Sequence, residues 1–189
     1  MNFENFEVYT GNEKLFNAAK LFSEQGIERG AWLVIQGKMT GTGKTHLLAA
    51  IANSAISRGI PTFYAYTTEL LDHLREGYRH GDGEEGDFEE RFDRVKRIRL
   101  LLLDDFGVQV NSDWAVERML ALFEARDTDG LPTAITTNLS ATEMGRISDR
   151  ILDRLVRHKP GITVENLAIK YREHQSQQRI LREQGGIPF

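Results

Sequence analysis

The chain has 189 residues, of which 40% are hydrophobic and 28% are charged, and its formal net charge at pH 7 is −4. This size and composition are typical of one globular domain with a sizeable core, and the negative charge argues against a nucleic-acid binder that is basic over its whole surface. The chain has no cysteine, no apolar run as long as a membrane span and no signal-peptide pattern, so we expect a cytoplasmic protein without disulfides, cysteine-ligated metal or membrane contact.

The first half of the chain alternates helical and strand patterns. In chain order, hydrophobic periodicity predicts a helix over 12–25, a strand over 31–36, a helix over 45–58, a strand over 61–66 and a helix over 68–78. Gly26 and Gly59 end the first two helices, and Thr67 or Thr68 is the expected N-cap of the third. A glycine- and acid-rich loop follows over 79–87, and we expect it to be a mobile, solvated loop and not a metal site.

The second half continues this alternation. Its predicted elements are a helix over 88–97, a buried strand over 98–107, a helix over 112–127, a strand over 132–138, helices after Ser140 and over 148–157, and a short strand over 161–166. Ser112 is a candidate helix cap, and Ser140 with Glu143 has the spacing of a capping box. The polar tail from residue 175 is expected to fray. The alternation predicts an α/β fold with a mainly parallel five-stranded sheet flanked by helices.

The stretch GKMTGTGKTHLL, residues 37–48, nearly matches the phosphate-binding pattern Gly-x-x-x-x-Gly-Lys-Ser/Thr. The first glycine of that pattern should be at position 38, where the chain has lysine, and Gly37 comes one residue too early. The stretch nevertheless lies between a predicted strand and a predicted helix. Gly41 and Gly43 allow backbone N–H groups to approach phosphate oxygens, and the helix N-terminus adds partial positive charge.

We therefore predict a nucleotide site whose loop is one residue longer than usual. Lys44 reaches the β- and γ-phosphates, and the Thr45 hydroxyl is a ligand for Mg²⁺. Gly37 serves the turn out of the strand, and Lys38 is a solvated loop cation. The nucleotide-binding residues predicted here are Gly41, Thr42, Gly43, Lys44 and Thr45. The alternative is a glycine-rich turn with a chance Gly-Lys-Thr.

An acid pair follows the most apolar strand. The run LLLLDD over 100–105 places Asp104 and Asp105 at the carboxyl end of a buried strand, beside the phosphate loop. Hydrolysis of a nucleotide needs an acid that holds the metal and a group that orients water. Asp104 is the candidate metal residue, through water, and Asp105 is the candidate for polarising the attacking water. The alternative is a pair of acids that only end a strand.

One asparagine and three arginines are further candidates. Asn138 follows an apolar strand, where it could hydrogen-bond the γ-phosphate or the attacking water, or could be a turn residue. Arg150, Arg154 and Arg157 are spaced to share one helical face. One of them could enter a neighbouring subunit's site as an arginine finger, and the alternative is a solvated basic face.

Five motifs in one order carry a resemblance to a known family: GTGKTHL, LLLLDDFGVQ, TTNLS, SDRILDRL and KYR. Together they resemble the AAA+ ATPase domain of bacterial replicative helicase loaders of the DnaC/DnaI type, which is related to the IstB-like ATPases. The resemblance covers about residues 3–172. It implies an N-terminal linker and helix over 1–30, an AAA+ core with the P-loop NTPase fold over 31–174 and a polar tail over 175–189.

The resemblance also implies roles for particular residues. Asn138 becomes the first sensor, Arg154 the finger and Arg172, in KYR, the second sensor near the γ-phosphate of the same subunit. Ser112 and Trp114 fall at the spacing of a serine and an aromatic that contact single-stranded DNA in the loaders, and an indole ring can stack on an unpaired base. The alternative for Trp114 is a core residue.

The resulting hypothesis is an ATPase that uses ATP and Mg²⁺, self-associates, and loads a replicative helicase in contact with single-stranded DNA. Family loaders usually carry an N-terminal domain that docks on the helicase, and this chain starts almost at the AAA+ core, so helicase loading rests on analogy more than ATP hydrolysis does. One alternative is an IstB-type transposition helper ATPase that acts on duplex DNA and a transposase. The other is an ATP-binding scaffold that does not hydrolyse.

Overall fold

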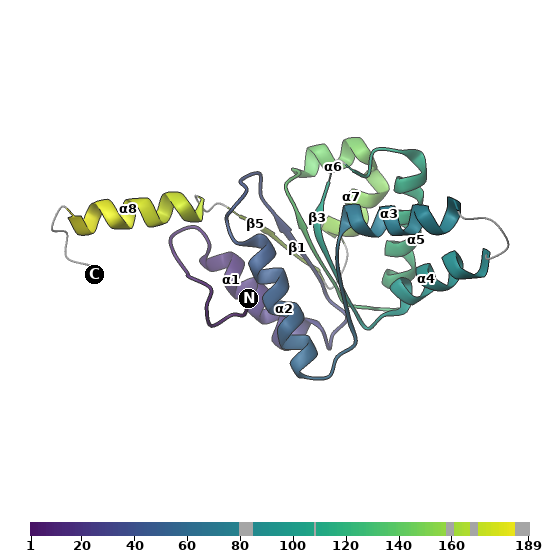
Figure 1. The fold of residues 1–189 in the computed structure, drawn as a ribbon, viewed down its shortest axis with the longest axis horizontal. Helices are drawn as coiled ribbons and strands as arrows, with labels where there is room; N and C mark the ends of the chain where they lie inside the picture. The colour runs from purple at the N-terminus through teal and green to yellow at the C-terminus, as the bar shows by residue number, and fades with distance from the viewer. Residues whose placement is uncertain (80–84, 108, 158–160, 167–169, 184–189) are drawn as a thin grey trace.

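All five predicted strands lie in one sheet (Figure 1). The structure is a computed structural model that describes residues 1–79, 85–107, 109–157, 161–166 and 170–183. Its parallel strands follow the order β2-β3-β4-β1-β5. They are β1 (Trp32–Gln36), β2 (Thr62–Tyr66), β3 (Leu100–Phe106), β4 (Thr133–Thr137) and β5 (Gly161–Glu165). The predicted α/β fold with a parallel sheet is confirmed.

Helices cover both faces of this sheet (Figure 1). The helices of the described chain are α1 (Glu13–Leu21), which continues into a π-helical turn η1 (Phe22–Gly26), α2 (Lys44–Ser57), α3 (Thr67–Arg79), α4 (Glu85–Arg97), α5 (Asp113–Thr128), α6 (Ala141–Ile147), α7 (Asp149–Arg157) and α8 (Tyr171–Glu183), of which α8 lies apart from the sheet. Trp32 and Val34 pack into a core with α3, α4, α5 and α7, whereas Leu33 and Ile35 pack into a second core with α1 and α2. Successive residues of a strand point to opposite faces, so a strand covered on both faces is apolar throughout.

Two predicted helix caps are confirmed. Ser112 Oγ accepts a hydrogen bond from the Ala115 N–H at 3.3 Å, at the start of α5. Ser140 and Glu143 form a complete capping box at the start of α6. These caps fix where the chain turns back after β3 and after β4.

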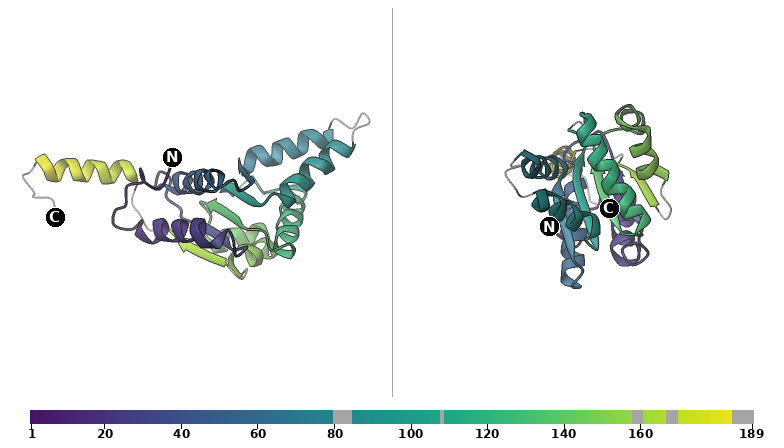
Figure 2. Two further views of the ribbon diagram at one scale, coloured as in Figure 1. Left: turned by 90° about the horizontal axis from the view of Figure 1, so that it is seen from below. Right: turned by 90° about the vertical axis from the view of Figure 1, so that its right-hand side faces the viewer.

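Two segments differ from the prediction. Residues 85–87, expected in the acid-rich loop, are the start of α4, and residues 80–84 of that loop lie outside the described residues. The expectation of a fraying tail from residue 175 is wrong as far as Glu183, because α8 continues to that residue. The tail is polar, but its glutamine, arginine, leucine and glutamate residues have high helix propensity. Figure 2 shows α8 extending away from the body of the molecule, at the opposite end from α3 and α4.

The order of the strands determines where a ligand can bind. Because β4 lies between β1 and β3, the loop that leaves β1 faces the chain that leaves β3 across the end of β4. Ligands of open parallel sheets bind at such positions, outside the carboxyl ends of the strands.

Within the described ranges, no helix combines the length and the apolar character needed to cross a membrane.

Candidate functional site

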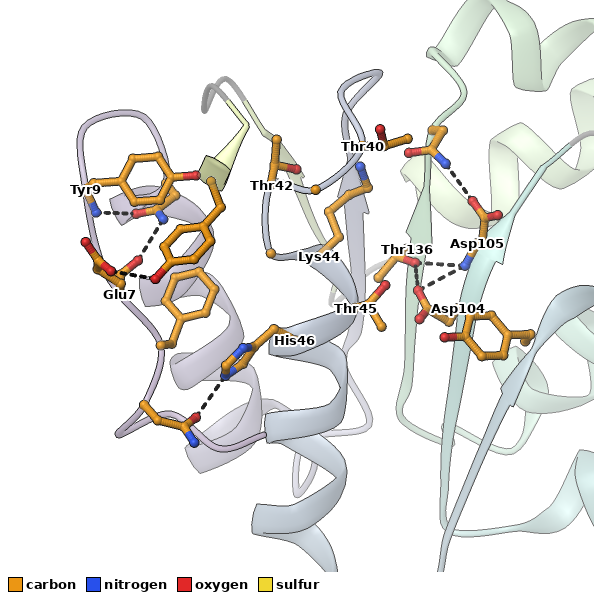
Figure 3. Close-up of a pocket in the computed structure, with 18 residues that line it drawn as sticks. Glu7, Tyr9, Thr40, Thr42, Lys44, Thr45, His46, Asp104, Asp105 and Thr136 are labelled. Atoms are coloured by element: carbon orange, nitrogen blue, oxygen red, sulfur yellow. Dashed lines mark hydrogen bonds between the residues drawn. The ribbon is translucent and has the colours of Figure 1, made fainter. Parts of the chain in front are cut away.

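A cavity of about 610 Å³ opens at the carboxyl ends of the strands. Figure 3 shows Lys44 and Thr45, the first two residues of α2, between two groups of side chains. One group, here the strand-end wall, consists of Tyr66, Asp104, Asp105, Thr136 and Asn138. The other, here the chain-end wall, consists of Asn5, Phe6, Glu7, Tyr9, Asn12 and Tyr171. The cavity therefore brings the predicted phosphate loop, acid pair and asparagine together.

Two glycines give the phosphate loop its shape. Gly41 has φ +70° and Gly43 has φ +92°, in the left-handed region that residues with a side chain seldom adopt. A Cβ at Gly43 would also lie only 2.6 Å from Phe6 Cε2. Gly43 immediately precedes Lys44, the first residue of α2, so the loop ends at a helix N-terminus. This is the arrangement in which backbone N–H groups and the helix dipole bind phosphate.

Gly37, the residue after β1, lies in close contact with its neighbours. Its N–H donates to the Thr137 carbonyl at 3.0 Å, and a Cβ at Gly37 would lie 2.8 Å from Asn166 Cβ. The Lys38 side chain is 72% exposed and pairs with Glu143 at 3.7 Å, away from the cavity. Lys38 thus lies where a solvated loop cation was expected.

Lys44 lies at the base of the cavity. Its Nζ donates to the carbonyl oxygens of Gly37, at 2.8 Å, and Met39, at 2.7 Å. Burial lowers the pKa of Lys44, and the nearby charges of Asp105 and Asp104 oppose that shift. Lys44 is also the only lysine or arginine among the described residues that line the cavity. Its ammonium group is therefore the cation that this chain offers to a bound phosphate.

Asp104 is held by side chains from both neighbouring strands. Its side chain lies almost fully buried at the end of β3, with a relative exposure of 1%. Oδ2 accepts a hydrogen bond from the Tyr64 hydroxyl at 2.7 Å, and Oδ1 accepts one from the Thr136 hydroxyl. Burial and the hydrogen bond to Asp104 raise the pKa of Tyr64 far above its ordinary value, so the phenol remains a donor.

Asp105 points away from Asp104 and has φ +53°, although it is not a glycine. The pairing of β3 with β4 is irregular here, between Leu103 and Phe106. The exposed carboxylate of Asp105 accepts a hydrogen bond from Asn138 Nδ2 at 2.6 Å. Asn138 Oδ1 is buried and has no hydrogen-bond partner within the described part of the chain. The Asp105 carboxylate is therefore an exposed acceptor at the open side of the acid pair, and the Asn138 amide nitrogen helps to orient it.

The residues present fit a magnesium ion that is held mainly by phosphate and water. Thr45 and Asp104 line the cavity on facing elements, α2 and β3. No group of three or more acidic or histidine side chains that could hold a metal occurs among the described residues. Mg²⁺ usually keeps several water ligands and takes one or two carboxylates together with substrate phosphates. The predicted pair of Thr45 and Asp104 matches that requirement.

The chain-end wall was not predicted from the sequence. Phe6 stacks on Phe16, with ring centroids 5.6 Å apart, and Tyr9 stacks on His174 of α8 at 4.1 Å. The Tyr171 N–H donates to the Gly41 carbonyl at 2.9 Å. One local signal was present, because Phe3, Phe6 and Tyr9 are aromatic residues spaced by three positions.

Glu7 connects the two chain ends of this wall. Its carboxylate accepts a hydrogen bond from the Tyr171 hydroxyl at 2.8 Å and lies 3.3 Å from His174 Nε2. Asn12, which is fully buried, holds the same turn by donating to the Glu7 carbonyl and accepting from the Tyr9 N–H. The hydrogen bond to Glu7 raises the pKa of Tyr171. Residues 5–12 and the first turn of α8 thus form one continuous side of the cavity.

The predicted arginines do not line the cavity. Arg154 Nη1 donates to Asp127 of α5 at 2.6 Å, and Arg150 pairs in the same way with Glu124 at 2.7 Å. The side chain of Arg157 lies outside the described residues. Arg172 is exposed and is not among the lining residues, a place that its neighbour Tyr171 takes. The structure therefore does not bring the predicted finger and second sensor to this chain's own cavity.

The two predicted DNA contacts lie outside the cavity as well. Ser112 Oγ serves as the cap of α5. Trp114 is partly buried against the core, and the Arg75 guanidinium lies 5.1 Å from the centroid of its ring. Trp114 therefore makes a core contact while part of its ring stays accessible, and its contact with DNA stays a prediction.

Comparison with curated proteins finds helicase loaders. The chain is 27% identical over 156 residues to the replicative helicase loader DnaC of Escherichia coli (strain K12), which covers 82% of this chain and 62% of that protein. It is 29% identical over 126 residues to the replicative helicase loader DnaI of Bacillus subtilis (strain 168), which covers 66% of this chain and 38% of that protein. The chain thus spans about three fifths or less of the length of these relatives.

Solved structures share the fold. A replication initiator DnaA bound to AMPPCP and single-stranded DNA matches with a TM-score of 0.76 and 27% identity, over 96% of this chain and 54% of that chain. The DnaC helicase loader matches with a TM-score of 0.70 and 21% identity, over 86% and 96% of the two chains. These neighbours are P-loop domains of the AAA+ type, and this chain has the same fold. Since residues 3–178 also match the family model described as IstB-like ATP binding protein, the chain belongs to that family.

Proposed function

We propose that this protein is a magnesium-dependent ATPase that completes its active site in an oligomer and serves as a loader of the replicative helicase. The observation that carries the proposal is the strand-end wall, which places Asp104, Asp105 and Asn138 across one cavity from Lys44 and Thr45. Family membership supports ATP binding and ATPase activity in general. The arrangement of the side chains supports the division of roles given below.

Each group of the cavity has one task in this mechanism. The backbone N–H groups of the loop and the Lys44 ammonium hold the phosphates, and Thr45 and Asp104 would hold Mg²⁺, which neutralises charge on the β- and γ-phosphates. Asp105 accepts a hydrogen bond from the attacking water, and Asn138 orients that water or the γ-phosphate. The water oxygen bonds to the γ-phosphorus as the bond to the bridging oxygen breaks, and the water gives a proton to Asp105, from which it passes to solvent; the products are ADP and phosphate.

The missing cation comes from a neighbouring copy in this proposal. Transition states of phosphoryl transfer use a positive charge beyond the metal and the P-loop lysine, often an arginine supplied in trans. Arg154 is directed to Asp127, away from its own cavity, and is partly exposed. A surface ion pair of this kind contributes about 0–1 kcal/mol, so exchanging Asp127 for a phosphate of another subunit costs little. Arg172 stays the candidate second sensor of its own subunit.

Names of relatives support the biological role. DnaC and DnaI are named replicative helicase loaders, and the DnaA structure contains single-stranded DNA. We therefore expect immobilised replicative helicase of the host to capture this protein, and capture to differ between ATP, ADP and no nucleotide. Lys44→Ala is the control for nucleotide dependence. If protein that binds ATP is captured in none of these states, the loader role is wrong, although the ATPase proposal stands.

A transposition helper ATPase is the second candidate, because the matching family model is named for IstB. The two candidates differ in the DNA that they hold. A loader should prefer a single-stranded oligonucleotide, and Trp114→Ala should weaken that binding by about 1–3 kcal/mol, the value of one base stacked on an aromatic ring. A transposition helper should prefer a duplex of the same length. Fluorescence anisotropy with both oligonucleotides at one salt concentration separates the candidates.

A further inference from the structure

Asp104 accepts hydrogen bonds from two side-chain hydroxyl groups, and the mechanism above gives the residues that donate them no role. Tyr64 reaches Asp104 from β2 and Thr136 reaches it from β4, one hydroxyl to each carboxylate oxygen. In the sheet, Tyr64 pairs with Leu102, two residues before Asp104 on the same face of β3. A ring at this diagonal position is long enough to reach the carboxylate. Tyr64 itself does not line the cavity, so it can act on a bound ligand only through Asp104.

Thr136 joins the two acids to each other. Its hydroxyl donates its one hydrogen to Asp104 Oδ1 and accepts the Asp105 N–H at 2.9 Å. That N–H lies where the pairing of β3 with β4 is irregular, and it also donates to Asp104 Oδ1 at 3.1 Å. The bond to Thr136 helps to hold Asp105 in its left-handed conformation at φ +53°, which turns its carboxylate toward Asn138. The Thr136 hydroxyl therefore helps to orient the carboxylates of Asp104 and Asp105 in different directions.

These contacts leave Asp104 able to accept a hydrogen bond from a further ligand. Oδ1 accepts from the Thr136 hydroxyl and from the Asp105 N–H at 3.1 Å, whereas Oδ2 accepts from the Tyr64 hydroxyl, so Oδ2 keeps a lone pair for a water molecule. The carboxylate cannot rotate without breaking hydrogen bonds on both sides. A ligand group fixed in this way needs no reorganisation when a metal ion arrives, and hydrogen bonds to metal-binding carboxylates are the usual means of fixing them.

We propose that Tyr64 and Thr136 are positioning residues of the magnesium site, with Tyr64 acting on Asp104 alone and Thr136 acting on both acids. This inference rests on the proposed function, because it assumes that Asp104 serves Mg²⁺. It predicts that two variants have different effects. Tyr64→Phe removes one hydroxyl and changes the metal dependence, whereas Thr136→Val removes the shared hydroxyl and changes both the metal dependence and the turnover.

The test measures binding of a fluorescent ATP analogue while MgCl₂ is titrated, with a parallel series in EDTA. For Tyr64→Phe, we expect the half-saturating Mg²⁺ concentration to rise about 10- to 100-fold, the usual effect of losing such a partner, with unchanged binding in EDTA. For Thr136→Val, turnover at saturating Mg²⁺ should fall as well, and Thr136→Ser, which keeps the hydroxyl, should restore it. Thr62→Val is the matched control, because it removes a β2 hydroxyl that bonds to the Ile60 carbonyl and does not touch Asp104.

Two results would overturn the inference. One is a Mg²⁺ midpoint in Tyr64→Phe equal to that of the unmodified protein and of Thr62→Val. The other is a parallel loss of binding in EDTA and in Mg²⁺ together with a lower melting temperature, which would make Tyr64 a residue of folding only. If Tyr64→Phe does not fold, the Thr136→Val and Thr136→Ser pair decides in the same assay. Failure of the proposed function is seen separately, as an unmodified protein whose nucleotide binding ignores Mg²⁺ or that does not hydrolyse ATP.

Discussion

The two walls of the cavity are built in different ways. In the strand-end wall, hydrogen bonds join Asp104 to Thr136, Thr136 to the Asp105 N–H and Asp105 to Asn138, and Tyr64 supports Asp104 from behind the wall. In the chain-end wall, an N-terminal segment meets the start of α8 through stacked rings and the carboxylate of Glu7. The first wall is part of the sheet, whereas the second joins segments from the two ends of the sequence. The groups proposed to act in bond breaking thus belong to the wall that is part of the sheet.

This difference suggests a functional division. Changes in the strand-end wall should act on the chemical step or on the metal, because its groups face the phosphate loop. Changes in the chain-end wall should act on nucleotide affinity, because its rings and polar groups lie on the far side of Lys44 and Thr45 (Figure 3). In kinetic terms, the first class should lower kcat and the second should raise KM.

The largest effect is expected at the centre, between the walls. Lys44→Ala removes the only lysine or arginine that lines the cavity among the described residues, so ATP hydrolysis should be lost. Lys38→Ala is the matched control from the same loop, and it should be nearly silent because its side chain is exposed and paired with Glu143. Isothermal calorimetry and a phosphate-release assay would check both. Equal losses in the two variants would assign Lys38 a phosphate role and contradict the interpretation of the loop.

The next effect concerns a cation that neither wall supplies. Arg154→Ala should bind ATP normally and lose about 10³–10⁵ in turnover, as expected for an arginine finger. Arg150→Ala, one turn earlier on α7 and also paired with α5, should lose much less. Specific activity of the unmodified protein should rise with protein concentration as oligomers form.

Mixing variants tests whether this cation acts in trans. An Arg154→Ala subunit beside a Lys44→Ala subunit can form an interface with an intact phosphate loop on one side and an intact Arg154 on the other. The mixture should therefore regain part of the activity that each variant lacks alone. A mixture that stays inactive, together with specific activity independent of concentration, would leave Arg154 as a surface residue paired with Asp127.

Asp105→Asn should have a somewhat smaller effect, confined to the chemical step. Loss of a group that assists proton transfer typically costs about 10²–10⁴ in rate. Asparagine tolerates the left-handed conformation at this position better than most residues, and its Oδ1 can still accept from Asn138, so the fold should be kept. Binding of Mg·ATP should remain unchanged by calorimetry while turnover falls. Loss of binding would instead make Asp105 a metal or folding residue and would weaken the contrast with Asp104.

The contrast between the walls also explains what could be predicted from the sequence. Lys44 belongs to a local motif, so its role could be predicted from neighbouring residues. Asp104 and Asp105 follow four leucines, so their position at a strand end could be predicted in the same way. The parts played by Tyr64 and Thr136 depend on β3 lying between β2 and β4, which a single sequence does not state. The chain-end wall depends on contacts such as that between Glu7 and Tyr171, far apart along the chain. The same limit explains why Tyr171, and not the predicted Arg172, lines the cavity.

The smallest effect is expected in the chain-end wall, and Tyr171→Ala gives the cleanest test of it. The Tyr171 backbone N–H bonds to the Gly41 carbonyl in any variant except proline, so the substitution removes the ring and its hydrogen bond to Glu7 without releasing the start of α8. We expect KM for ATP to rise several-fold while kcat at saturating ATP stays unchanged, because the metal acid and Asp105 lie on the other wall. Glu7→Gln, which keeps the acceptor but removes the charge near His174, should give a still smaller rise. Steady-state kinetics over a range of ATP concentrations separates the two constants. A fall in kcat with KM unchanged would mean that the chain ends take part in the chemical step, and the division between the walls would be wrong.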